Sequence, residues 1–165
     1  MPFSIYQGMW NVMDCNFEWE IIPMARNEGP ALAPWNVLTA GKFCRGAEGE
    51  AHSRNGEYHK MFSQFERTEK GKRVSEALKK IATEVGIKHT TAVAIAYCLH
   101  KVLHVFLLID GCKFEHVHAS LEALGILLSD ARMKELEAAP EFDLGFPSSF
   151  IVSHIFFVKL CTNLI

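Results

Sequence analysis

Three short apolar runs, each followed by sequence of helical character, constrain the fold of this chain more than any other feature. They cover residues 3–7, 31–35 and 105–109. Strands that are apolar throughout and alternate with helices are typical of parallel β-structure covered by helices. The first run begins two residues after Met1, which leaves no room upstream for further βα units. The sequence therefore predicts a βα repeat that is entered midway.

Helical periodicity and end signals place five helices between and after these runs. A polar stretch rich in Gly, Glu, Arg and Ser, residues 41–72, separates the second run from the next helix and is expected to be a functional or disordered loop. The first expected helix covers residues 17–26 and is closed by 27–29, with Pro23 near its start or at a kink, and the second covers 74–85 and ends at Gly86. The third, residues 91–101, is capped by Thr90 and is nearly apolar, so we expect it to be buried. The fourth turns Phe114, Val117, Leu121 and Leu124 inward, and the last is capped by Ser129 and runs to about Ala139.

Composition supports one domain and excludes several functions. The 165 residues are 49% hydrophobic with a net charge of −2, which allows a real core and gives no basic footprint for nucleic acid. Five widely spaced cysteines without a CxxC pair indicate free thiols in a reducing compartment, and we expect a cytoplasmic protein without a secretory signal. The apolar tail 150–165 is shorter than the roughly 20 residues of a membrane span, and His154 and Lys159 interrupt it. We expect this tail to be a docking segment or an addition outside the main fold.

Polar and aromatic residues at the expected carboxyl ends of the strands favour a (β/α)8 barrel over a doubly wound sheet. Gln7, Trp35 and the turn 110–113 are all placed there, on the face where barrel enzymes build their sites. No GxGxxG sequence follows any of the runs, which weakens the dinucleotide-binding sheet as an alternative.

Several segments at these positions resemble one branch of the aldo-keto reductases, the fungal aryl-alcohol dehydrogenases together with the norsolorinic acid reductases. The similarity runs from about residue 2 to 150 and is carried by residues 2–13, 21–26, 31–35, 92–97, 115–116, 122–124 and 142–147. The resemblance implies an α/β fold, a partial (β/α)8 TIM barrel that holds strands six to eight with their helices in residues 1–149. It also implies NADP(H) as cofactor and aromatic or polyketide aldehydes and ketones as substrates. The family's catalytic Asp, Tyr, Lys and His come from earlier strands, and none of them maps onto this chain.

The cofactor half of the family pattern does map. By resemblance, Gln7 would hydrogen-bond the nicotinamide carboxamide, since an amide side chain both donates and accepts. Trp35 would stack on the nicotinamide ring, which needs a large rigid π-surface. The remaining cofactor positions are Asn36 and Leu38 beside the pyrophosphate, and Cys112, Lys113, His116 and Ser120 at the adenosine 2′-phosphate and adenine.

Departures from the family pattern weaken the adenosine end. The chain has Asp110-Gly-Cys-Lys113 where the family has Gly-Gly-Arg-Lys, so an arginine that could pair with a phosphate is replaced and an aspartate would repel it. Cofactor binding is therefore expected to be weakened or lost. No metal site is expected, because His116 and His118 point in different directions on a helix.

Two functions stay open. One is a truncated NADP(H)-dependent reductase that is inactive by itself. The other is a non-catalytic remnant that binds cofactor weakly or pairs with another subunit, since strands six and eight would expose open edges through which chains can self-associate.

Overall fold

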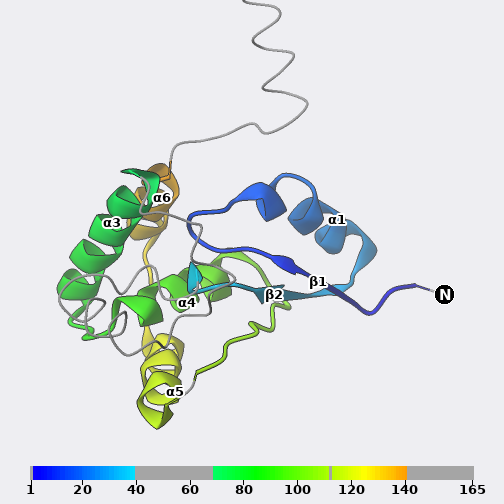
Figure 1. Ribbon diagram of the computed structural model, residues 1–165. Coiled ribbons are helices and arrows are strands. Elements are labelled where there is room, and N and C mark those ends of the chain that lie inside the picture. Colours follow the sequence, from blue (N-terminus) through cyan, green and yellow to red (C-terminus); the bar gives the residue numbers. More distant parts are fainter. Residues whose placement is uncertain (1, 40–68, 112, 141–165) are drawn as a thin grey trace, which may run out of the picture.

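The computed structural model describes residues 2–39, 69–111 and 113–140. Strands and helices alternate in the first part and helices dominate the second (Figure 1). In chain order the elements are β1 (Ile5–Met9), the 3-10 turn η1 (Asn16–Glu18), α1 (Ile21–Glu28), β2 (Ala31–Trp35), α3 (Glu69–Val85), α4 (Thr90–Lys101), α5 (Phe114–Leu121), the 3-10 turn η4 (Glu122–Gly125) and α6 (Asp130–Ala138).

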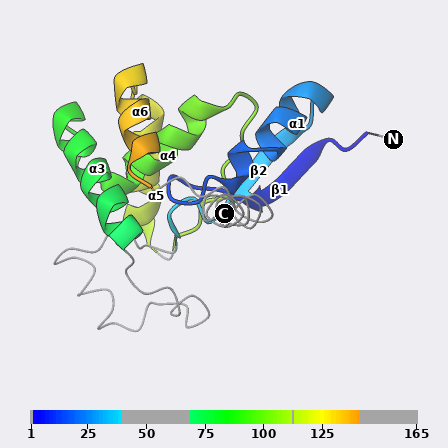
Figure 2. The same ribbon diagram turned by 90° about the horizontal axis from the view of Figure 1, so that it is seen from above.

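The two strands run parallel, with Ile5 opposite Ala31 and Met9 opposite Trp35. One face of the pair packs on the η1–α1 segment, and Figure 2 shows α1 lying along the strands. The Phe17 ring stacks on Trp10 at 6.0 Å and also lies against Tyr6. Gly8 leaves the space for this ring, because a Cβ there would lie 2.5 Å from Phe17 Cε2. On the other face of the pair, the described residues leave Ile5, Gln7, Met9 and Trp35 exposed.

The third apolar run lies beside β2 but does not form a regular strand. Only Val105 makes a bridge, to Leu32, while the amides of Phe106 and Leu108 donate to the carbonyls of Leu32 and Pro34 at 2.8 and 2.9 Å. A parallel ladder would also need an N–H at position 34 to donate back to Phe106, and proline has none. The expectation of a regular third strand is therefore wrong, because residues 105–109 form one bridge to β2 in place of a continuous ladder. The run does lie beside β2, as expected.

Two glycines end helices as their positions predict. Gly29 and Gly86 have φ of 84° and 76° after α1 and α3, in the left-handed region that glycine adopts without steric cost. Pro23 lies in the first turn of α1, where a missing amide hydrogen costs nothing.

The predicted buried helix is confirmed, with one difference at its start. Residues 92–98 of α4 are all buried and form the centre of the core with Trp10, Leu32, Leu78, Ile81 and Leu136. The residue before the helix, at its cap position, is His89, and Thr90 is the first helical residue. Ser129 does occupy the cap position of α6, but its hydroxyl makes no capping hydrogen bond.

The prediction for α5 is wrong in its orientation. The apolar stripe that was expected to point inward is exposed: Phe114 at 74%, Val117 at 50%, Leu121 at 54% and Leu124 at 72%. The helix and the adjoining η4 are held instead by the small buried residues Ala119 and Ala123. Periodicity identified the apolar face correctly, but the described residues leave all four of its side chains at least half exposed.

Several predictions fall outside the described residues. These are Cys112, nearly all of the polar stretch 41–72, residues 142–147 and the tail 150–165. The boundary at residue 149 therefore stays a prediction. Within the described parts no helix is long and apolar enough to cross a membrane, and Cys15 and Cys98 are free thiols.

Candidate functional site

Gln7 and Trp35 lie on the same face of neighbouring strands. The register places Gln7 opposite Ala33 and Trp35 opposite Met9, and side chains two residues apart along a strand share a face. Both side chains are exposed on the face that the helices leave uncovered, Trp35 by 37%. The structure thus puts an amide and a rigid aromatic surface diagonally beside one another.

Trp35 ends its strand as expected, whereas Gln7 does not. Pairing of Gly8 and Met9 with Pro34 and Trp35 extends β1 to Met9, so Gln7 is the middle residue of its strand. Its expected position at the carboxyl end is therefore wrong by two residues. The amide still shares the face with Trp35.

The turn after Trp35 has an unusual backbone conformation. Asn36 has a φ of 59°, a left-handed conformation that asparagine tolerates better than most residues. Its carbonyl accepts a hydrogen bond from the amide of Thr39 at 3.0 Å, which closes the turn. Leu38 is half-buried and packs against the core, so it holds this turn against the core.

Asn11 holds this turn from the neighbouring loop, and sequence reasoning did not single it out. Its side chain is 1% exposed and its Nδ2 donates to the carbonyl of Asn36 at 3.2 Å. Its Oδ1 accepts from the amides of Met13 and Asp14, both at 2.9 Å. The signal was present, because an asparagine in the loop after a strand often hydrogen-bonds the backbone two residues on.

The residues predicted for the adenosine end are only partly brought together. His116 and Ser120 line an apolar cavity of about 310 Å³ together with Asp110. The Ser120 hydroxyl donates to the carbonyl of His116 at 2.8 Å, so this hydroxyl is engaged within its own helix. Lys113 is exposed and takes the cap position of α5, and it does not line the cavity.

The cavity walls are made mostly by helix α4, the third run and α5. The complete lining is Ile95, Leu99, Leu107, Ile109, Asp110, His116, Val117, Ser120, Leu121 and Leu124. Gln7, Trp35, Asn36 and Leu38 do not belong to it. The predicted site residues therefore form two groups, one on the open sheet face and one beside α5.

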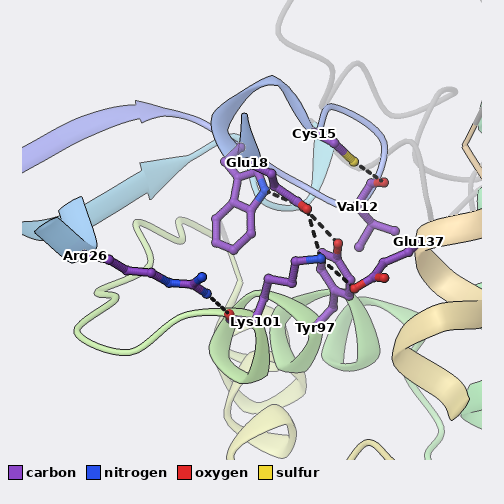
Figure 3. Close-up of polar contacts among 8 residues, drawn as sticks. Val12, Cys15, Glu18, Arg26, Tyr97, Lys101 and Glu137 are labelled. Carbon is purple, nitrogen blue, oxygen red and sulfur yellow. Dashed lines mark hydrogen bonds and ion pairs between the residues drawn. The ribbon is translucent and has the colours of Figure 1, made fainter. Parts of the chain in front are cut away.

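A separate polar cluster centred on Glu18 ties η1 to α4 and α6 (Figure 3). Glu18 Oε1 accepts from Trp10 Nε1 at 3.2 Å and from the Tyr97 hydroxyl at 2.9 Å, while Lys101 Nζ lies 2.9 Å from Glu18 Oε2 and 2.5 Å from Glu137 Oε1. This cluster was not predicted. Its members are spread over the sequence, and no short motif contains them.

Burial and nearby charges raise the pKa values of three groups around Glu18, so that each of them keeps its proton. Burial, with the nearby Glu18 charge, raises the pKa of the Cys15 thiol to about 11 and raises the pKa of the Tyr97 hydroxyl as well. Burial alone would lower the pKa of Lys101, but its hydrogen bonds to Glu137 and Glu18 outweigh this and raise it. At neutral pH the Cys15 thiol and the Tyr97 phenol therefore stay protonated, and neither is an activated nucleophile.

Among the described residues no group of three or more His, Cys, Asp or Glu side chains is placed to hold a metal ion. His100 hydrogen-bonds the carbonyl of Ile126 at 2.8 Å, so this imidazole has a partner within the protein.

In sequence the chain matches one family and several of its fungal members. The model described as "Aldo/keto reductase family" matches residues 1–141. The chain is 47% identical over 151 residues to AAD10, assigned as an aryl-alcohol dehydrogenase in Saccharomyces cerevisiae, covering 91% of this chain and 52% of that protein. It is 46% identical to the aryl-alcohol dehydrogenase (NADP(+)) of Phanerodontia chrysosporium, covering 88% and 39%, and 43% identical to norsolorinic acid reductase of Aspergillus flavus, covering 91% and 36%.

In structure the chain resembles part of a barrel. It superposes on the glycerol dehydrogenase of Gluconobacter oxydans with a TM-score of 0.66 at 18% identity, covering 88% of this chain and 46% of that one. A thermostable aldo-keto reductase gives a TM-score of 0.59 at 20% identity, covering 84% and 40%. The expected fold, a partial (β/α)8 barrel, is therefore confirmed. The chain spans about half or less of the length of these relatives.

Proposed function

Because this chain belongs to the aldo/keto reductase family, we propose that it carries the cofactor-binding half of an NADP(H)-dependent oxidoreductase. Its substrates would be aromatic or polyketide aldehydes and ketones, which are reduced to alcohols. The relatives named as an NADP(+) aryl-alcohol dehydrogenase and a norsolorinic acid reductase support this choice. The single observation that carries the proposal is that the side chains of Gln7 and Trp35 lie on the same exposed face of the sheet.

The residues on this face suit the nicotinamide end of such a cofactor. Trp35 offers a flat, partly exposed indole against which a planar ring can stack. Gln7, exposed on the same face, has a donor and an acceptor for a carboxamide. When bound, the cofactor would supply hydride to the carbonyl carbon of the substrate. The chain's own role is to fix which face of the nicotinamide ring meets the substrate.

The residues at the other end suit a 2′-phosphate less well. Lys113 is exposed at the start of α5 and offers a positive charge. Asp110, however, lines the neighbouring cavity with His116 and Ser120, and a carboxylate repels a phosphate. We therefore propose that the affinity for NADP(H) is lower than in relatives that have an arginine in this turn.

We further propose that these 165 residues have no reductase activity by themselves. The family resemblance supports this proposal, because it places the catalytic Asp, Tyr, Lys and His of the family on earlier strands than those to which this chain is similar. The second candidate function is a remnant that pairs with another polypeptide without catalysis, and the aspartate at position 110 favours it. Two free thiols, Cys15 and Cys98, support the proposal that the protein resides in the cytoplasm, where thiols stay reduced.

Titration of the 165-residue chain with NADPH, followed by cofactor fluorescence, tests the proposal. We expect saturable binding that Trp35→Ala weakens at least tenfold and Trp35→Phe largely restores. Trp19→Ala is the matched control, because Trp19 has nearly the same exposure, 39% against 37%, and lies outside the site. Absence of binding by the unmodified chain would reject the cofactor proposal and favour the remnant.

A further inference from the structure

Two consecutive residues after β1 hold the chain at the point where it leaves β2. The backbone amide of Trp10 donates to the carbonyl of Trp35 at 3.3 Å, and the Asn11 Nδ2 donates to the carbonyl of Asn36 at 3.2 Å. These two carbonyls belong to the peptide planes on either side of the Asn36 Cα, and each peptide plane is rigid. The two hydrogen bonds therefore fix the rotation between the planes, which is the backbone conformation of Asn36.

The backbone conformation of this turn is one that needs outside contacts. Asn36 has a φ of 59°, and Thr39, at the other end of the turn, has a φ of 51°. Left-handed backbone is uncommon for residues with a Cβ and persists where the surrounding structure determines it. The Thr39 amide closes the turn from within by donating to the Asn36 carbonyl at 3.0 Å. The Asn11 side chain joins the same carbonyl to the loop after β1.

The Asn11 side chain is placed to hold this turn and not to contact a ligand. It is 1% exposed, and its Oδ1 accepts from the amides of Met13 and Asp14, both at 2.9 Å. Both polar ends of the amide are thus engaged with backbone groups. A neutral amide combines the donor and the acceptor that this position uses. Asn11 can therefore affect a ligand only through the residues that it holds.

Release of the Asn36 carbonyl would be felt at Trp35. Downstream, Val37 is 1% exposed and Leu38 packs against the core, so that end of the turn is fixed. If Asn36 relaxed toward the commoner right-handed backbone, the peptide plane that it shares with Trp35 would have to turn. The Trp35 indole, which lies on the same face of the sheet as Gln7, would then change its tilt.

We propose that Asn11 is a positioning residue for cofactor binding: through the Asn36 carbonyl it sets the orientation of the Trp35 indole, against which the nicotinamide ring stacks. The ligand in this statement rests on the proposed function, whereas the effect of Asn11 on Trp35 does not. Stacking depends on the offset and tilt of the two rings. A reoriented indole should therefore bind the ring less well, although no contacting atom has been removed.

Cofactor titration of Asn11→Asp and Asn11→Ser, each in the full chain, tests the proposal. An aspartate has no donor for the Asn36 carbonyl, and a serine hydroxyl is too short to reach it. We expect each variant to weaken NADPH binding roughly fivefold, which is within the range of an aromatic stacking contact. Circular dichroism shows whether each variant is folded, and Asn11→Ser decides the matter if the buried charge of Asn11→Asp prevents folding.

Asn16→Asp is the matched control, because it makes the same change at an exposed residue of η1. Its affinity for NADPH should stay within about twofold of the unmodified chain. In a chain that already carries Trp35→Ala, Asn11→Ser should also change the remaining affinity by less than about twofold, because the indole that it orients is absent. A merely structural role of Asn11 would lower the affinity equally with and without Trp35.

The indole N–H resonance of Trp35 in two-dimensional NMR spectra of the nitrogen-15-labelled chain reads the orientation without cofactor. We expect Asn11→Ser to move this resonance and to leave that of Trp19 in place. Unchanged NADPH affinity in folded Asn11→Ser would overturn the proposal, as would an equal loss of affinity in the Trp35→Ala chain. If the unmodified chain does not bind NADPH, the proposed function fails, and the Trp35 resonance then decides by itself. A resonance that moves supports the positioning role, and one that does not move overturns it.

Discussion

Asn11 shows how one buried amide can position a predicted cofactor residue without touching the cofactor. Its Nδ2 reaches the carbonyl of Asn36, directly after Trp35, while its Oδ1 organises the loop after β1. A carboxylate in its place keeps the acceptor and loses the donor. The donor is therefore the part of Asn11 that can be tested by itself.

Asn11→Asp should lower the free energy of unfolding by about 1–3 kcal/mol, because the Asn36 carbonyl loses one of its two donors, keeping the Thr39 amide, and faces a buried charge instead. Urea unfolding monitored by circular dichroism measures this. Asn16→Asp, on an exposed residue at the start of η1, should change stability by less than about 0.5 kcal/mol. Equal effects of the two substitutions would contradict the role assigned to the Asn11 side chain.

The Cys15 thiol predicts a fall in stability at alkaline pH. Burial and the Glu18 charge raise its pKa from 9.0 to about 11, so the unfolded chain loses this proton first as pH rises. Its contribution is complete below pH 9 and is lost as pH rises toward 11. Partial exposure limits the loss to about 2 kcal/mol or less. In urea unfolding at pH 8 and pH 10.5 under reducing conditions, Cys15→Ala should show a smaller fall than the unmodified chain. An unchanged fall would contradict this.

At the scale of elements, the Glu18 cluster joins three parts that the sheet does not connect. It binds η1 to α4 through Tyr97 and Lys101, and Lys101 continues to Glu137 on α6. Arg26 at the end of α1 also reaches the carbonyl of Lys101. Because these contacts are partly buried, their loss should cost more than that of an exposed ion pair.

Glu18→Gln should therefore lower the free energy of unfolding by about 2 kcal/mol, since Lys101 loses one of its two carboxylates in a partly buried site. Glu84→Gln is the control, because Glu84 pairs with Arg132 and Lys80 in a more exposed setting. That change should cost less than about 1 kcal/mol. Chemical denaturation of both variants decides the matter, and a larger effect at Glu84 would refute the ranking.

Pro34 leads to an element-scale prediction for the third run. Pro34→Ala supplies the missing N–H, so that position 34 can donate to Phe106 and close a regular ladder. Hydrogen exchange should then show slower exchange at Leu108, whose amide already donates to the carbonyl of residue 34. The amide of Met9, on the far side of β1, should be unaffected. No slowing at Leu108 would mean that another constraint keeps the run irregular.

At the scale of the whole molecule, the order of elements could be predicted and their surroundings could not. Alternating apolar runs and helical stripes gave the parallel α/β arrangement, the buried residues 92–98 and the glycines that end α1 and α3. The α5 stripe was misassigned because periodicity defines an apolar face and says nothing about which element covers it. The irregular third run depended on a proline in the neighbouring strand, and the Asn11 and Glu18 contacts join residues up to 83 positions apart in the sequence. The pairing of Gln7 with Trp35 followed from the family resemblance, and composition alone could not have given it.

The apolar sheet face with Ile5, Met9, Trp35, Phe106 and Leu108, which stays exposed among the described residues, should make the folded chain bind hydrophobic dyes. We expect the fluorescence of anilinonaphthalene sulfonate to rise on addition of the native protein and to fall when Phe106→Glu and Leu108→Glu are combined. Near-ultraviolet circular dichroism of the same samples shows whether tertiary packing is intact. Dye binding unaltered by the double substitution would place the apolar surface elsewhere.

Pro34 has one more consequence, for misfolding. Its imide nitrogen points away from β1, so the β1–β2 ladder loses no donor in the observed register. If β2 slipped by one residue, the same nitrogen would face β1 and every side chain of β2 would change faces. The slipped pairing would lose a hydrogen bond and bury Trp35 against the helices at the same time. Pro34 therefore weakens the contact of β2 with the third run, and it protects the register of β2 against β1 during folding.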